Sequence, residues 1–141
     1  MSDAALQTPP STAAPQLLVL SGPPALTTFE ADRLSARLRS IDSAVTGIDA
    51  AFFYILLVAG DVDSIGSPEM ARLTDLLELT STGIPEPRLF IAPRIGTQSP
   101  WSSKATDILH NTGFTNVQRI ERVRAIHIRG VRNPLVLAPV L

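Results

Sequence analysis

The chain has 141 residues, of which 45% are hydrophobic and 18% are charged, and its formal net charge is −1. This balance describes one soluble globular domain with no overall attraction to nucleic acid or to an anionic membrane. Because there is no cysteine, disulfides, thiol nucleophiles and cysteine-bound metal sites are excluded. No apolar run is long enough to span a bilayer. The first residues do not form a secretory signal, so we expect a cytoplasmic protein.

The first part of the chain predicts a leader, a strand, a helix and a second strand. Residues 1–15 are small, polar and proline-bearing, which is typical of a disordered leader. Leu17–Leu20 is a short apolar strand that we expect to stop at Ser21–Pro24. Thr27 and the glutamate three residues later form a capping box for a helix. Ile48–Ala59 is apolar on both faces, which predicts a central strand covered on both sides.

Two further helices are predicted by paired start and stop signals. Ser67 and Ser99 each precede a proline, the pattern of an N-cap followed by proline in the first turn. We expect Gly83 to end the first of these helices and Gly113 to end the second. Along one side of the second helix lie Trp101, Ala105, Ile108 and Thr112.

Two more strands complete the pattern. Arg88–Ala92 is short, whereas Val117–Ile128 is long and loses its alternation near Arg122, which predicts a bulge or a register change there. Strands and helices alternate along residues 16–129, and this order fits an α+β fold with helices packed on one side of a mainly antiparallel sheet. The proline-broken residues 130–141 predict an irregular tail.

Hydroxyl and basic groups gather where a strand joins a helix, between Ala92 and Asp107. Backbone N–H groups at a helix start, together with such side chains, suit an anion such as a phosphate. Ordinary capping chemistry explains the same residues, and the spaced glycines of a phosphate-binding loop are absent. The candidate anion ligands are Arg94, Thr97, Ser99, Ser102, Ser103 and Lys104.

Five arginines between Arg119 and Arg132 form the one basic concentration, opposed locally by Glu121. RNA binding would need aromatic platforms beside such a stripe, and no aromatic residue follows Phe114. Docking on an acidic partner or internal pairing is therefore favoured over nucleic acid. The acidic residues Asp61, Asp63 and Glu69 lack the further ligands of a calcium loop, so we expect no metal site.

The segment Pro93–Gly113, followed by Val117–Arg122, resembles the N-terminal domain of the long, single-chain phosphoribosylformylglycinamidine synthase of purine biosynthesis. The opening Leu20–Leu26 and the first predicted helix resemble the same domain. The similarity extends over roughly Leu17 to Ile128, and the stretch Pro100–Asp107 is the most specific part of it.

The resemblance implies a fold like a fused dimer of the small synthase subunit that some organisms make separately. The full-length enzyme uses ATP, magnesium and ammonia from glutamine to amidate formylglycinamide ribonucleotide, and those sites belong to downstream domains. The implied role here is assembly of the synthetase and glutaminase parts and ammonia transfer, with no catalytic residue and no cofactor in this chain. The implied interface residues are Arg94, Thr97, Ser99, Trp101, Ser102, Ser103, Lys104 and Asp107.

The end of the chain departs from that family, which continues through a helical linker where residues 130–141 stand. This departure predicts a truncated or frameshifted product, or an isolated piece of the longer enzyme. Apolar surface built for the synthetase and glutaminase domains would then be exposed, and we expect self-association. An alternative hypothesis is a stand-alone adaptor that binds a phosphorylated metabolite at the helix start, residues 99–104.

Overall fold

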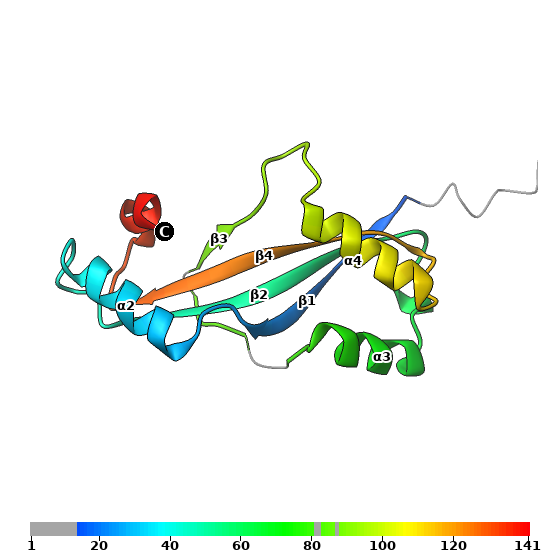
Figure 1. The fold of residues 1–141 in the computed structure, drawn as a ribbon, viewed down its shortest axis with the longest axis horizontal. Coiled ribbons are helices and arrows are strands. Elements are labelled where there is room, and N and C mark those ends of the chain that lie inside the picture. Colours follow the sequence, from blue (N-terminus) through cyan, green and yellow to red (C-terminus); the bar gives the residue numbers. More distant parts are fainter. Residues whose placement is uncertain (1–13, 81–82, 87) are drawn as a thin grey trace, which may run out of the picture.

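The fold is a single four-stranded antiparallel sheet with helices on one face. It is taken from a computed structural model, which describes residues 14–80, 83–86 and 88–141. The strand order is β1-β2-β4-β3, so the two long strands β2 and β4 form the centre (Figure 1). The predicted α+β class with a mainly antiparallel sheet is confirmed. The strands are β1 Gln16–Pro24, β2 Gly47–Val58, β3 Leu89–Ile91 and β4 Val117–Arg129.

The α-helices of the described chain pack on the same face of the sheet, which confirms the predicted layering. Helix α2 (Thr28–Arg39) covers one end of the sheet, and α4 (Pro100–Asn111) covers the other (Figure 1). Helix α3 (Ser67–Leu77) packs beside α4. Two 3-10 helices, η2 (Val62–Ser64) and η3 (Pro134–Val140), complete the described elements.

The core of the helix-covered face consists of two clusters, one under each end. Because side chains alternate along a strand, the even-numbered residues of β2 all point to this face. Leu56 packs with Leu73 of α3 and Leu109 of α4 in the first cluster. In the second cluster Ile48 packs with Leu38 of α2.

The opposite face of the sheet is apolar, but no helix of the described chain covers it. Phe53, Val123 and Ala125 form a small buried cluster there, against which Ile84 packs. Leu17 is nevertheless 64% exposed, and both Val19 and Phe90 are more than half exposed. The prediction that β2 is covered on both sides is therefore wrong. We call this surface the open face; it comprises Leu17, Val19, Phe53, Ile55, Phe90 and Val123.

The helix ends agree with the sequence at α2 and α4 and differ at α3. The Thr27 capping box forms, Ser99 is the N-cap of α4, and Gly113 is left-handed with φ 102°. The prediction that Ser67 caps α3 is wrong, because the helix starts one residue earlier with Gly66 as N-cap. Gly83 lies beyond the end of α3, whose left-handed cap is Glu78 with φ 53°.

The end of β1 and the irregularity of β4 both differ from the predictions. Strand β1 does not stop at Ser21 but continues to Pro24 through a register shift, which an edge strand allows because proline need not donate on its free side. Neither the bulge nor the register change expected near Arg122 occurs, since this residue pairs regularly with Tyr54. The irregularity in the β2–β4 pairing lies instead between Leu57 and Val58.

The tail, expected to be irregular, contains η3. Its Leu137 is buried in the second cluster, where it packs with Leu38 and Ile128. The residues that suggested a broken, exposed ending therefore contribute to the core. The predicted leader falls mostly on residues 1–13, which lie outside the described chain.

Gly22 tests how closely β1 packs on β2. A Cβ atom at Gly22 would lie 2.6 Å from Cε2 of Tyr54 and 3.0 Å from the carbonyl oxygen of Phe52. We expect Gly22→Ala to lower the free energy of unfolding by about 1–3 kcal/mol, since the neighbours must shift. Urea unfolding with an unchanged m value measures this. Gly83→Ala is the control, because nothing lies within 4 Å of its Cβ position; equal losses in both variants would contradict the packing.

Candidate functional site at the start of helix α4

The eight candidate residues lie on the loop before α4 and on its first two turns. They do not share one environment. Ser102 is fully buried, whereas Ser99 and Trp101 are half-buried. The exposed candidates are Arg94, Thr97, Ser103, Lys104 and Asp107.

The N-terminus of α4 already holds a negative charge from within the chain. The Ser99 hydroxyl accepts a hydrogen bond from the Ser102 N–H at 3.0 Å and donates to Oε1 of Glu121 at 2.8 Å. The Ser99 N–H donates to Oε2 of Glu121 at 3.5 Å. A carboxylate is favourable at the positive end of a helix dipole. An anionic ligand at this point would therefore meet the charge of Glu121.

Glu121 also joins the loop to strand β4. Its Oε2 lies 3.2 Å from the guanidinium of Arg119, which donates a second hydrogen bond to the carbonyl of Thr97 at 2.9 Å. Burial raises the pKa of Glu121, but hydrogen bonds from Ser99, Arg122 and Arg119 outweigh it and hold that pKa below its ordinary value. The ionised carboxylate is thus the form that fastens α4 and its loop to the sheet.

Two hydroxyls of α4 take the place of a neighbouring strand. Strand β3 pairs with β4 only over the three residues from Arg124, so the backbone of Ile120 has no strand partner on that side. The Ser102 hydroxyl donates to the carbonyl of Ile120, and the N–H of Ile120 donates to Oγ1 of Thr106 at 3.2 Å. Buried backbone groups need such partners. Ser102 therefore has a structural role in this chain.

Because of these contacts, the side of α4 that faces the sheet differs from the side along which the predicted stripe runs. The buried positions of α4 are Ser102, Thr106 and Leu109, whereas Ile108 is 47% exposed. Trp101 and Ala105 of the predicted stripe pack against the first cluster, but the most deeply buried positions lie on the neighbouring side of the helix. Hydrophobic periodicity did not identify that side, because two of its three buried residues are polar.

Trp101 is part of an aromatic and cationic stack on the helix-covered face. Its ring stacks on Tyr54 with centroids 5.8 Å apart and planes at 14°. The guanidinium of Arg122 lies 4.7 Å from the Trp101 ring centroid and 4.8 Å from that of Phe52. Contacts of this kind are cation–π interactions.

The five arginines near the C-terminus do not form one basic stripe. Arg119 lies beside Glu121, and Arg129 pairs with Asp49 at 3.2 Å. Arg122 and Arg124 point to the helix-covered face, opposite Tyr54 and Phe52. In the sequence, the period-two spacing of Arg122 and Arg124 could have shown that these two arginines share one face of the strand. Glu121 is the only acidic residue in this stretch, and it could have indicated the side chain that caps α4.

No set of three histidine, aspartate or glutamate side chains in the described residues is placed to hold a metal ion. No helix in the same part of the chain is long and apolar enough to cross a membrane.

Residues 52–136 match the family described as formylglycinamide ribonucleotide amidotransferase N-terminal. The chain belongs to this family. The match runs from within β2 to within η3, so it contains the whole of α3, β3, α4 and β4. The resemblance to the N-terminal domain of phosphoribosylformylglycinamidine synthase, an enzyme of purine biosynthesis, is therefore confirmed.

Glu121 makes stability depend on pH in a defined direction. Its folded pKa is below the ordinary value of 4.5, so its contribution is fully present above that value and is lost as pH falls through the folded pKa. We expect Glu121→Gln to cost about 1–2 kcal/mol at neutral pH and to flatten the loss of stability in acid. Urea unfolding at several pH values measures both effects.

The control is Asp107→Asn, which removes an exposed carboxylate from α4, the helix that Glu121 caps. We expect it to leave the neutral stability within about 0.5 kcal/mol of that of the parent chain. If Glu121→Gln kept the full acid slope, the cap on α4 would not be charged in the way described.

Proposed function

We propose that this chain is a non-catalytic assembly domain of phosphoribosylformylglycinamidine synthase, which joins the synthetase and glutaminase parts and supports ammonia transfer between them. The observation that carries the proposal is the open face of the sheet. Membership of the family supplies the partners, and the open face supplies a surface with which to bind them.

The open face has the properties of a protein interface. It contains a shallow hollow of about 430 Å³ whose lining is entirely apolar. Val19 and Phe90 stand at its sides, 58% and 59% exposed. Contiguous apolar patches of this kind mark binding surfaces, because leaving them in water is unfavourable. We assign the open face to the synthetase part of the same enzyme. The hollow is lined by Val19, Phe53, Ile55, Phe90, Ala92 and Val123.

The loop between β3 and α4 supplies a polar margin for this contact. It starts at Ala92, which lines the hollow, and carries the exposed Arg94 and Thr97 before it reaches α4. Lys104 and Asp107 extend the exposed polar groups along the outer side of the helix. A polar rim around an apolar centre is the usual anatomy of an interface. These exposed residues are our interface candidates.

A non-catalytic role predicts that the purified chain turns over neither ATP nor glutamine. We expect phosphate release and glutamate release to stay at the rate of the uncatalysed background, measured with coupled assays over long incubations. Turnover of either substrate that grows with protein concentration and survives repeated purification would contradict the assembly role.

The open face can be tested directly by placing charges on it. We expect the double variant Val19→Asp, Phe90→Asp to lose capture of the synthetase part in a pull-down, since a desolvated carboxylate costs several kcal/mol at an interface. Self-association of the isolated chain, measured by light scattering, should fall in the same variant. Both residues are exposed, so the fold should tolerate the changes.

The matched control is Phe29→Asp, because Phe29 is 71% exposed but lies on α2, away from the open face. It should bind the synthetase part like the parent chain. If the double variant bound as well as the control, the open face would not be the docking surface. If it lost only self-association, the face would be a contact between copies of the chain instead.

A further inference from the structure

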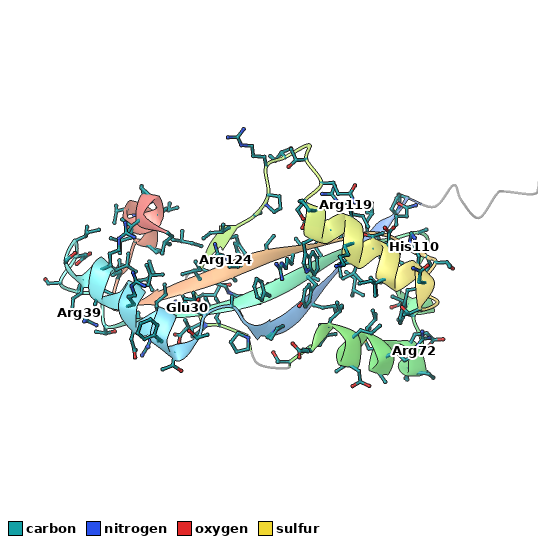
Figure 2. All side chains as sticks on the ribbon, viewed as in Figure 1. Glu30, Arg39, Arg72, His110, Arg119 and Arg124 are labelled. Atoms are coloured by element: carbon teal, nitrogen blue, oxygen red, sulfur yellow. The ribbon has the colours of Figure 1, made fainter. Side chains whose placement is uncertain are left out.

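A second hollow lies on the helix-covered face, in the interval between α2 and α4. Its volume is about 450 Å³. Figure 2 shows Arg124 over the middle of the sheet, between the two helices. A site of this size is within the range of small-molecule sites. The lining residues are Ala25, Phe52, Ile91, Ala92, Pro93, Arg122 and Arg124.

The hollow contains two positive charges and no negative one. Arg122 and Arg124 occupy alternate positions of β4, so both side chains rise from the same face. Both are half-buried, and no acidic residue lines the hollow. Within the described residues, neither guanidinium forms an ion pair with a carboxylate. Guanidinium groups stay charged at any physiological pH, and partly buried charges favour a counter-charge.

Arg122, the arginine nearer to α4, is held in place before any ligand binds. Its guanidinium lies against both Phe52 and Trp101, at 4.8 Å and 4.7 Å from the two ring centroids. Trp101 is in turn stacked on Tyr54. A side chain that is already ordered loses less conformational entropy on binding. Arg122 is therefore a preorganised donor at the edge of the hollow.

We propose that this hollow binds a small phosphomonoester. A phosphate group carries a charge close to −2 at neutral pH and several acceptor oxygens, which matches two guanidinium forks. The apolar wall of Phe52, Ile91 and Pro93 is suited to the organic part of such a ligand. The hollow lies on the opposite face of the sheet from the proposed interface, and the two linings share only Ala92. Variants at Arg124 and at Val19 therefore test the two proposals separately.

The test uses the only tryptophan of the chain as its reporter. Because the Arg122 guanidinium lies over the Trp101 ring, a phosphate bound to this guanidinium brings negative charge close to the indole and should change the tryptophan fluorescence. We would titrate the purified chain with glycerol phosphate and, in parallel, with sodium chloride at the same ionic strength. The proposal expects a saturable change at millimolar or lower glycerol phosphate and none with chloride.

The variants assign the response to the hollow. Arg124→Gln does not touch the reporter and should weaken binding at least about tenfold, as expected for the loss of a charge-assisted hydrogen bond. The control is Arg33→Gln, an exposed arginine of α2 that does not line the hollow, which should bind like the parent chain. Circular dichroism would establish that both variants keep the fold.

Three results would overturn the proposal. These are no saturable response up to tens of millimolar, an unchanged affinity in Arg124→Gln, and a response to chloride equal to that of glycerol phosphate. A poly-aspartate peptide serves as the competing probe. If it bound in an Arg124-dependent way while glycerol phosphate did not, the hollow would belong to an acidic protein segment instead of a small phosphate ester.

Discussion

The hydrogen-bonded ladder between β2 and β4 decides which side chains point to the helix-covered face and which point to the open face. The two strands pair from Gly47 opposite Arg129 to Leu57 opposite Arg119 without interruption. Since side chains alternate along both strands, one ladder sends Leu56 and Ile120 to the helices and Phe53 and Val123 to the open face. A slip of one residue would exchange these two sets. The buried core, the proposed interface and the arginine hollow therefore depend on one register.

The contact between α4 and β4 shows how a strand without a full neighbour is completed by a helix. Ser102 and Thr106 provide the donor and the acceptor that a further strand would have provided to Ile120. Glu121, on the same strand, then accepts a hydrogen bond from Ser99 at the start of the helix. Three of the residues that look like a ligand site in the sequence, Ser99, Trp101 and Ser102, are thus used for internal attachment. On the same strand, Arg122 and Arg124 form no ion pair within the described residues.

Sequence patterns predicted the elements well where the signal is local. The capping box at Thr27, the N-cap at Ser99 and the left-handed Gly113 depend on neighbouring residues, and all three form. The patterns were wrong where the partner is distant. An apolar face on β2 predicts burial but does not say whether this chain or another protein provides the cover, so the open face was missed. The likeness to a fused dimer of the small synthase subunit stays a prediction.

The candidate site illustrates the same limit. Its residue types were correctly singled out as belonging to a helix start, but the carboxylate that reaches it, Glu121, is 22 positions away from Ser99 along the chain. Hydrophobic spacing along α4 failed for a related reason, because Ser102 and Thr106 are buried by hydrogen bonds to β4 and not by apolar contact.

The outer edge of β1 has a consequence for handling the isolated chain. Among the described strands β1 pairs only with β2. Thr80 donates hydrogen bonds to the carbonyls of Ser21 and Gly22, but the outer backbone groups from Gln16 to Leu20 have no strand partner among the described residues. The half near Pro23 and Pro24 is protected against pairing with another strand, because proline cannot donate a backbone hydrogen bond and the register shift bends the edge. The half from Gln16 to Leu20 has no proline and no register shift, and its Leu17 and Val19 side chains are exposed. Slow growth of β-rich aggregates during storage should therefore begin at this half of β1, and a single lysine there would act as a gatekeeper.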